Sequence, residues 1–340
     1  MPFLPVLPDD RDALVAAIDV LNTAGAVDDP DAVPDDVETY RGYLRYGWDL
    51  NPGQRLLFVP EGESEPVGAL TIELPVRDNR QLVWAELTVV PERRREGVGS
   101  QLMAELVRRT REAGRTTIWA GGPKDAPYTA GFLEHHGFRY ASHDARRRQL
   151  LANLDRVELE RLRCAALEAS ADYDLERLVP PQSDELLVEI AVVAEAINDA
   201  PMGDLTFERE VMDLQRMRDL EQARVGRGER HYRVVARHRG TGELAGHTVM
   251  TVEPAKPRWG GQGDTAVARQ HRGHRLGMLL KTEMLRWLGE VEPQLEEIET
   301  WNQADNDPMI AVNEAMGYRL NLNPPILTAV SARHRRRMPF

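Results

Sequence analysis

Arg94-Arg95-Glu96-Gly97-Val98-Gly99 lies between an apolar stretch at residues 84–91 and an amphipathic stretch at 100–113. A strand that ends in such a loop and continues into a helix turns successive backbone N–H groups toward one point, where the helix dipole adds partial positive charge. Gly97 and Gly99 let an anion approach closely because they have no Cβ. The loop arginines add charge suited to a pyrophosphate. The segment predicts a phosphate-binding strand–loop–helix unit.

The same pattern returns 178 residues further along the chain. Residues 261–268 precede the loop His271-Arg272-Gly273-His274-Arg275-Leu276-Gly277, and a helical stretch follows at 278–290. Downstream of each helix come a strand, a short acidic loop, a second helix and a Gly-aromatic pair, first at Gly137-Phe138 and then at Gly317-Tyr318. Matched features in one order indicate a duplicated domain. The offset aligns Arg94 with Arg272, Glu86 with Asp264, Val89 with Val267 and Gly99 with Gly277.

The mixture of strands and helices in each copy predicts an α+β fold. We expect an N-terminal domain at residues 1–153, a connecting helix at 154–171 and a C-terminal domain at 172–340. The expected helices are 10–22, 37–46, 100–113, 128–136, 155–171, 184–198, 207–223, 276–289 and 308–316. The expected strands begin at residue 2 and continue at 55–59, 67–76, 81–90, 116–120, about 138–152, 173–178, 231–237, 244–252, 297–301 and up to about 331.

Composition narrows the class of protein. The chain has 340 residues, enough for about two domains, and 42% of them are hydrophobic, yet no apolar run approaches the roughly 18 residues of a membrane helix. The net charge of −12 disfavours nucleic acid as a partner, and we interpret the arginine-rich tail at 333–337 as a solvated end. The N-terminus lacks a signal sequence, and the single cysteine, Cys164, excludes an internal disulfide. We expect a cytoplasmic protein with no membrane partner.

The motifs resemble those of a known family. Residues 94–99 match the Q/R-x-x-G-x-G/A signature of the GNAT superfamily of N-acetyltransferases, and residues 271–277 look like a variant of it. Residues 306–318 are similar to the superfamily motif N-x-x-A-x-x-x-Y-x-x-x-G-F. The resemblance covers nearly the whole chain as two tandem domains, an arrangement similar to that of mycothiol synthase. It implies that each domain is a mixed, mostly antiparallel twisted sheet flanked by helices.

The resemblance also implies a reaction. Acetyl-CoA would place its pyrophosphate on the loop and its pantetheine along the strand before it, and a primary amine of a small molecule would attack the acetyl group directly. A carboxylate on that strand is a plausible base, which points to Glu86 in the first copy and Asp264 in the second. The residues expected to bind the cofactor are Val89, Val90, Arg94, Arg95, Gly97, Val98, Gly99 and Ser100 in the first copy, and Ala266, Val267, Arg272, Gly273, His274, Arg275, Leu276, Gly277, Asn302 and Asn306 in the second.

Both copies depart from the family pattern. Leu133 and Asn313 stand where the family has its tyrosine, the usual general acid, so the identity of the acid stays open. Asn306 survives in the second copy, whereas the first has Ala126, and Arg275 replaces a loop glycine. We favour the second copy for catalysis and expect Arg275 to keep a negative φ with its side chain in solvent.

Two classes of function remain open. The first is acetyl transfer to a small amine such as an amino sugar or amino acid, with a protein lysine as a variant. The second is a non-catalytic acyl-CoA-binding or interaction protein with degenerate domains. We interpret His271 and His274 as solvent-exposed and expect no metal site. The protein is expected to be a monomer with two pseudo-equivalent domains, or a homodimer.

Overall fold

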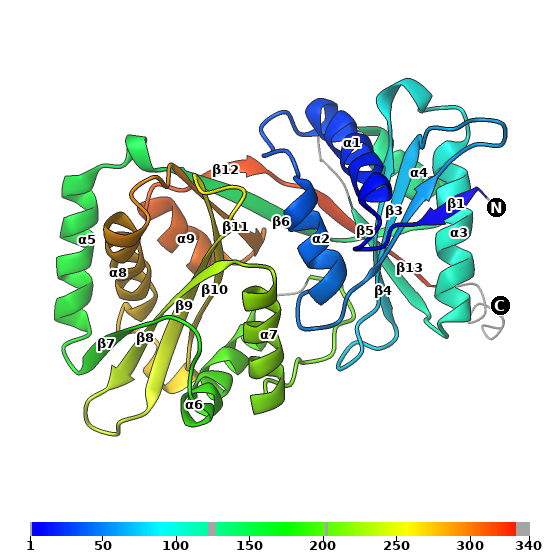
Figure 1. Cartoon of the computed structure of the whole chain (residues 1–340). Helices are drawn as coiled ribbons and strands as arrows, with labels where there is room; N and C mark the ends of the chain where they lie inside the picture. Colours follow the sequence, from blue (N-terminus) through cyan, green and yellow to red (C-terminus); the bar gives the residue numbers. More distant parts are fainter. Residues whose placement is uncertain (1, 122–126, 201–202, 331–340) are drawn as a thin grey trace. The chain divides into compact units, whose positions relative to one another are not determined.

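A computed structural model describes residues 2–121, 127–200 and 203–330, and the chain forms two compact units (Figure 1). Unit 1 comprises residues 1–143, 203–208 and 323–340, and unit 2 comprises 144–202 and 209–322. The domain boundaries expected from the sequence are 1–153, 154–171 and 172–340. They were drawn from the internal repeat, and they remain a prediction. The compact units differ from them because two segments of the second half belong to unit 1.

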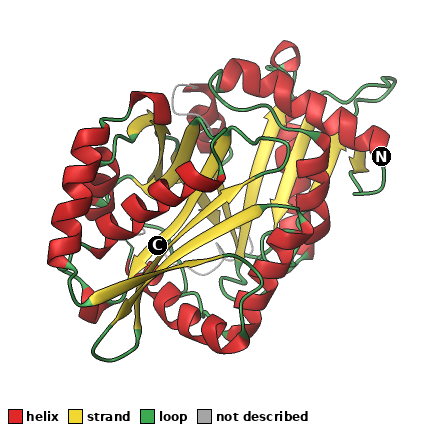
Figure 2. Cartoon of the chain, turned by 60° about the vertical axis from the view of Figure 1, so that its left-hand side comes forward, coloured by secondary structure: helices red, strands yellow, loops and turns green. Residues whose placement is uncertain are grey.

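Unit 1 is a sheet with helices on both faces (Figure 2). Its strands run in the order β1-β2-β3-β4-β5-β13-β6, and the β4–β5 pair is parallel while the others are antiparallel. Strand β6 contributes residues 139–143 to this unit. The elements are β1 (Phe3–Pro5), α1 (Arg11–Asp28), α2 (Val37–Tyr46), β2 (Gln54–Phe58), β3 (Gly68–Glu73), β4 (Leu82–Val89), η1 (Pro91–Arg93), α3 (Val98–Glu112), β5 (Thr117–Gly121), α4 (Pro127–His135), β6 (Arg139–Leu150) and β13 (Pro325–Val330).

Unit 2 repeats this plan. Its strand order is β6-β11-β10-β9-β8-β7, with β12 also paired to β6, and β10–β11 is the parallel pair. The elements that follow β6 are η2 (Leu151–Asn153), α5 (Arg156–Ala169), β7 (Tyr173–Leu178), α6 (Asp184–Ala194), η3 (Glu195–Asp199), α7 (Leu214–Gly226), β8 (Arg230–His238), β9 (Leu244–Val252), β10 (Trp259–Val267), η4 (Arg269–His271), α8 (Leu276–Val291), β11 (Glu297–Gln303), α9 (Asp307–Ala315) and β12 (Arg319–Leu322). The predicted α+β class is confirmed.

Each sheet buries an apolar cluster on either face. In unit 1, Leu70 and Leu102 belong to the cluster under α3, while Leu14 and Leu57 belong to the one under α1 and α2. In unit 2, α5 and α8 cover the larger cluster, and α6 and α7 cover the smaller one on the opposite face. Because side chains alternate between the two faces of a sheet, a strand can contribute residues to the clusters on both faces.

The sequence predicts several elements correctly. Helix 37–46 and strand 173–178 are confirmed as α2 and β7. The predicted helix 207–223 is wrong at its start, because α7 begins at Leu214, where the Asp213 side chain accepts a hydrogen bond from the Arg216 N–H at 2.7 Å. The closing strands expected near 138–152 form the single strand β6.

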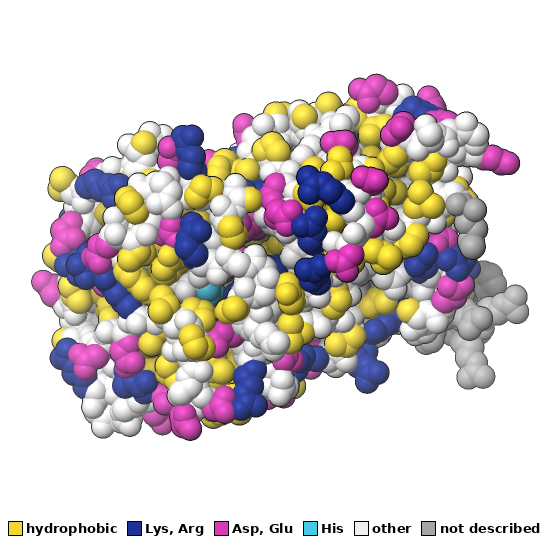
Figure 3. All heavy atoms as spheres, viewed as in Figure 1, with side chains coloured by type: hydrophobic (Ala, Val, Ile, Leu, Met, Phe, Trp, Pro, Cys, Tyr) yellow, Lys and Arg dark blue, Asp and Glu magenta, His cyan; other side chains and the backbone are white. Residues whose placement is uncertain are grey.

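Charged side chains of both signs are interspersed on the face in Figure 3. Many of them form ion pairs, such as Arg177 with Glu290 and Arg237 with Glu189. In the described ranges, no helix combines the length and apolar character needed to cross a membrane. The arginine-rich tail at 333–337 lies outside the described residues.

Asn79 fixes the segment 203–208 within unit 1. Its side chain is 2% exposed, its backbone N–H donates to a Glu208 carboxylate oxygen at 2.9 Å, and its amide donates to the Glu208 carbonyl at 3.1 Å. The Glu208 N–H donates to the Asn79 Oδ1 at 2.6 Å. Phe207 stacks on the buried Trp119, with ring centroids 5.7 Å apart. Reciprocal hydrogen bonds and one aromatic contact thus hold a segment that departs from the local order of the chain.

We predict that Asn79→Ala lowers the free energy of unfolding by about 1–3 kcal/mol, because it removes both hydrogen bonds between the Asn79 side chain and the part-buried backbone groups of Glu208. Asn79 also has a φ of 53°, which alanine adopts less readily than asparagine. Urea titration measures the change, and Gln101→Ala on the exposed side of α3 is the control. Equal stabilities of the two variants would contradict the assignment.

Candidate active site

In unit 1 the loop between β4 and α3 makes its turn with two residues of positive φ. Arg95 has a φ of 67° and Gly97, the residue before the helix, has a φ of 86°. The short helix η1 precedes them. Glycine takes the second of these conformations without strain, whereas Arg95 takes the first at a steric cost.

The loop of unit 2 has the same geometry with the glycine moved. Gly273 has a φ of 90° and Arg275 has a φ of 55°, at positions equivalent to Arg95 and Gly97. The expectation that Arg275 keeps a negative φ is wrong, because the turn into α8 needs a left-handed residue there whichever residue occupies it. Its side chain is exposed, as expected.

Arg94 and Arg272 brace the two loops in the same way. The Arg94 Nε donates to the Val89 carbonyl at 3.0 Å, and its guanidinium pairs with Asp28 at 2.7 Å. The Arg272 Nε donates to the Val267 carbonyl at 3.1 Å, and its guanidinium pairs with Asp199 at 2.6 Å. These side chains, expected to bind the cofactor, therefore have a positioning role in the structure: each ties the end of a strand to a neighbouring helical segment.

The helices that follow the loops begin without a side-chain cap. Neither Gly97 nor Arg275 donates or accepts a capping side-chain bond, whereas α1, α2, α5, α6, α7 and α9 all have one. The first-turn N–H groups of a helix have no intrahelical acceptor. A Cβ added at Gly277 meets no atom within 4 Å, so the start of α8 faces open space. A Cβ at Gly99 lies 3.2 Å from the Phe132 ring.

The remaining loop residues divide between core and surface. Val98 and Leu276 are buried in the clusters under α3 and α8, so their part in any cofactor site is limited to their backbone. The Ser100 hydroxyl lies 3.4 Å from His136 Nε2. Of the other expected residues, Ala266 is buried, Val89, Val90 and Val267 are half-buried, and His274 is exposed.

In both units the two parallel strands separate before the loop. The β4–β5 pairing ends at Ala85 with Ala120, although β4 continues to Val89. The β10–β11 pairing ends at Gln262 with Thr300, although β10 continues to Val267. The backbone beyond these pairs therefore borders a gap in the parallel ladder.

Strand β10 has a bulge that β4 lacks. Gln262 pairs with Met250 and Thr265 pairs with Thr248, so Gly263 and Asp264 stand opposite the single residue Val249. The register of β3 and β4 is continuous from Gly68–Val89 to Glu73–Trp84. A bulge interrupts the ladder and redirects a side chain, and it places the backbone of Asp264 outside the pairing on both sides.

Glu86 lies in a row across unit 1. Arg55 on β2 pairs with Thr71 on β3, which pairs with Glu86 on β4, so the charged residues of this row share the α1/α2 face. Part of the Glu86 surface is open to solvent, yet the surrounding protein desolvates the carboxyl and raises its pKa, and the nearby Glu73 and Asp35 add to this. Burial likewise raises the pKa of Tyr40 to about 12.

Asp264 lies in the equivalent row of unit 2. Arg233 on β8 pairs with Val249 on β9, which faces the bulge that carries Asp264. Asp264 is exposed, and its charge acts on the buried Arg233. The Arg233 guanidinium contacts Nδ1 of the buried His247. The structure thus places an arginine in the same row as each predicted base, and the sequence had not singled out either arginine, although the offset of 178 also aligns Arg55 with Arg233.

The two residues at the position of the family tyrosine, Leu133 and Asn313, are buried and have no hydroxyl group. Leu133 is 3% exposed, and Asn313, which is fully buried, donates to the Asn302 side-chain carbonyl at 2.8 Å. Asn306 caps α9 by accepting from the Met309 N–H at 3.4 Å. These contacts give Asn302 and Asn306 structural roles, and Ala126 lies outside the described residues.

The interpretation of His271 as solvent-exposed is wrong. His271 is 6% exposed, and its Nδ1 lies 3.0 Å from the Tyr173 hydroxyl. His274 is exposed, as expected. The tyrosine of β7 packs against the loop and takes the first histidine out of solvent.

The family model of the acetyltransferase (GNAT) family matches residues 26–138 and 195–318, more than half of the chain. The chain belongs to the GNAT family. It is an acyltransferase built as two tandem GNAT domains, as predicted. Members of this family generally use acetyl-CoA.

Relatives of similar length support this placement. The chain is 29% identical over 240 residues to the mycothiol acetyltransferase of Saccharomonospora viridis, covering 69% of this chain and 70% of that protein. A tandem GNAT protein from the clavulanic acid biosynthesis pathway superposes with a TM-score of 0.79 at 29% identity, covering 97% of this chain and 98% of that one. A GCN5-related N-acetyltransferase from Sphaerobacter thermophilus shares the fold, with a TM-score of 0.69 at 15% identity over 97% of this chain and 96% of that one.

We predict that Gly273→Ala lowers the free energy of unfolding by about 1–2 kcal/mol, since a left-handed conformation costs an L-residue that amount. A Cβ there meets no atom within 4 Å, so the cost is conformational. Gly277→Ala is the matched control, because that glycine is helical and alanine is the better helix former. Thermal or urea unfolding separates the two. A Gly277→Ala variant as unstable as Gly273→Ala would contradict this reading of the loop.

Proposed function

We propose that unit 2 transfers the acetyl group of acetyl-CoA to a primary amine of a small molecule, with Asp264 as the base. The observation that carries the proposal is the bulge at Gly263 and Asp264, which sets this carboxylate apart from its counterpart Glu86 in the regular strand β4. Bulges recur beside active sites because they aim a side chain and free backbone groups for a ligand.

The residues of the second loop fit the anionic part of the cofactor. The uncapped start of α8, the positive φ of Gly273 and Arg275, and the open space at Gly277 together provide backbone donors without an obstructing side chain. The backbone of Thr265–Val267 borders the gap beyond the last β10–β11 pair and offers donors and acceptors to an extended chain. Bound acetyl-CoA supplies the activated acetyl group as a thioester.

The chain's own residues then have separate tasks. Asp264 accepts a proton from the acceptor, either from its ammonium before attack or from the amine nitrogen as it bonds to the acetyl carbon, directly or through water. The N–H groups at the bulge are placed to hold the thioester oxygen, where negative charge develops during attack. Arg272 keeps the loop against Val267 and Asp199, so the donors stay in position. The group that protonates the leaving thiolate is not the family tyrosine, because Asn313 occupies that position.

A second role is favoured for unit 1, namely acyl-CoA binding without turnover. It keeps the loop geometry and the gap between parallel strands, but its β4 has no bulge. Tyr128 contacts both Asp28 and Arg94 and covers the brace of this loop, with its ring 5.1 Å from the guanidinium.

Asp264→Asn and Glu86→Gln form a matched pair that tests which copy is catalytic. We predict that Asp264→Asn lowers kcat by about 100-fold or more, the usual contribution of a general base. Glu86→Gln should leave kcat near the wild-type value. Release of free CoA thiol from acetyl-CoA over a panel of small amines measures both.

The Kd for acetyl-CoA distinguishes the role of Asp264. It should be close to wild type in Asp264→Asn, because the residue acts on the acceptor amine. Equal losses of affinity and turnover would remove its role as base. The reversed pattern, with Glu86→Gln inactive and Asp264→Asn active, would move catalysis to unit 1.

We predict that Gly277→Phe weakens acetyl-CoA binding at least about tenfold, a loss of roughly 1.4 kcal/mol. The side chain projects into open space at the start of α8, so it obstructs the ligand and spares the fold. Gly289→Phe on the same helix, where a Cβ also meets no atom within 4 Å, is the control. Isothermal titration gives affinity and stoichiometry. Unchanged affinity in Gly277→Phe would show that the second loop is not the cofactor site.

A further inference from the structure

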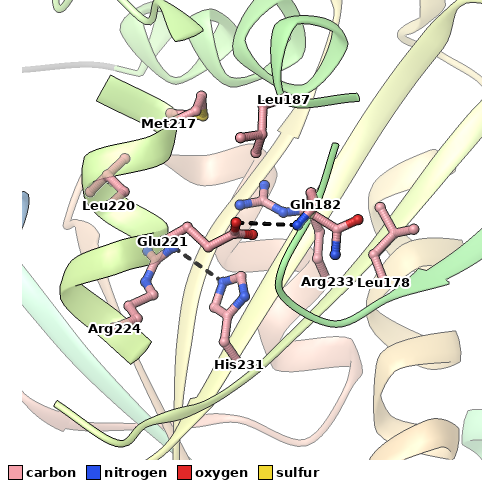
Figure 4. Close-up of a pocket in the computed structure, with 9 residues that line it drawn as sticks. All are labelled: Leu178, Gln182, Leu187, Met217, Leu220, Glu221, Arg224, His231 and Arg233. Atoms are coloured by element: carbon pink, nitrogen blue, oxygen red, sulfur yellow. Dashed lines mark hydrogen bonds between the residues drawn. The ribbon is translucent and has the colours of Figure 1, made fainter. Parts of the chain in front are cut away.

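Unit 2 contains a small polar pocket between its sheet and the helices α6 and α7. Its polar lining consists of Gln182, Glu221, Arg224, His231 and Arg233, and apolar side chains of β7, α6 and α7 complete it (Figure 4). The cavity measures about 10 Å³, room for about one water molecule or one oxygen of a larger group. A space this small between guanidinium groups selects for a single polar atom.

The lining carries more positive than negative charge. Arg224 and Arg233 are each 9% exposed, and the neighbouring His231 is 7% exposed. Burial lowers the pKa of His231 well below its ordinary value, and the two arginines lower it further, so His231 is neutral. Burial lowers the pKa of Arg233 to about 9, which leaves it protonated at neutral pH. Burial also raises the pKa of Glu221, the carboxyl in the lining, which receives the Gln182 N–H at 3.2 Å.

In unit 1 the arginine equivalent to Arg233 forms an ion pair with a carboxylate of the same unit. Arg55, the counterpart of Arg233, pairs with Glu73 at 2.6 Å. In unit 2 the residue equivalent to Glu73 is Thr251, and Arg233 instead contacts the neutral imidazole of His247. In the part of the chain that the structure describes, no carboxylate forms an ion pair with Arg233. The second copy has kept the arginine and lost the carboxylate that forms its direct ion pair in the first, and the charges of Asp264 and of Glu221 in the pocket lining act on Arg233 without such a pair.

Arg233 also connects the pocket to the proposed base. It lies in the row Arg233–Val249–Asp264 on the face covered by α6 and α7, and Asp264 exerts its charge on it. A ligand held by Arg233 is thereby placed on the same side of the sheet as Asp264. Buried guanidinium groups are costly unless an anion pairs with them, and a planar carboxylate is their best geometric match.

We propose that this pocket receives one oxygen of a carboxylate of the acceptor, with the rest of that group at the pocket's opening, so that unit 2 acts on amines that also carry a carboxylate. Arg233 donates to the carboxylate and Arg224 adds positive charge, while the amine extends toward Asp264. This inference rests on the proposed function for the acceptor's amine. The anion-binding part stands on the pocket alone and has a test without turnover.

The first experiment compares matched amines. Glycine, β-alanine, 4-aminobutyrate and 5-aminovalerate are assayed against their carboxamides by release of CoA thiol. Wild type should favour the acid at one chain length at least by roughly tenfold in kcat/KM, the range of a charge-assisted hydrogen bond. Arg233→Gln should remove the preference by raising KM for the acid, and Arg233→Lys should restore part of it.

The second experiment measures anion binding directly. Formate replaces chloride at constant ionic strength, and the thermal unfolding midpoint of the full chain is followed. Wild type should be stabilised by formate, since a ligand that binds the folded state raises its midpoint. Arg233→Gln should lose that shift, while Arg55→Gln, the equivalent change in unit 1, should keep it. If Arg233→Gln fails to fold, Arg233→Lys and the wild-type titration still decide the outcome.

The outcomes separate the two proposals. Formate stabilisation that depends on Arg233, with no CoA released for any amine, supports the pocket and contradicts the proposed acetyl transfer. Turnover of amines with no preference for a carboxylate, and no formate effect, overturns the pocket proposal alone. Equal formate shifts in wild type and Arg233→Gln also overturn it.

Discussion

The turn from strand to helix is the constraint on which both units depend. To leave a strand, pass a short 3-10 helix and start a long helix against the same sheet, the chain needs two left-handed residues at fixed spacing. Each unit supplies glycine at only one of them, Gly97 in the first and Gly273 in the second. The cost at Arg95 and Arg275 is offset by the helix packing and by the arginine braces that hold the loop. A loop restrained in this way keeps its N–H groups fixed before any anion arrives.

The sequence was sufficient to predict this unit and its repetition. An offset of 178 aligns the loops, the braces Arg94 and Arg272, and the tight glycines Gly68 and Gly246, each of which lies against the backbone of the neighbouring strand. Local signals of this kind survive duplication because each depends on residues close in the chain. They also placed α2 and β7 correctly, where capping and alternation are clear.

Features set by distant pairing were not predicted. Strand β13 completes the sheet of unit 1, and residues 203–208 return there, because Ile326 and Asn79 find partners far away in the chain. The bulge at Gly263 and Asp264 shifts the register between β9 and β10 by one residue. Aligning the loops of the two copies does not reveal this shift. The positive φ of Arg275 could not be predicted from the residue type, because the turn requires a left-handed conformation at a position where arginine is unfavourable. The sequence placed Glu86, Asp264 and the loop residues along the chain. The charged residues near them could be identified only from the pairing of the strands in the sheet.

The two rows across the sheets differ in how their charges are paired. Both copies place an arginine on the second strand and a carboxylate on the fourth, on the same face. In the first, Glu73 forms an ion pair with Arg55 within the unit, and desolvation, with a smaller contribution from the nearby acids, raises the pKa of Glu86. In the second, Thr251 stands at the position of Glu73 and cannot form that ion pair, and Asp264 lies on a bulge, whereas Glu86 lies in a regular strand. Because a buried charge is costly unless an opposite charge pairs with it, the loss of the carboxylate equivalent to Glu73 is the change from which the proposed anion site of unit 2 follows.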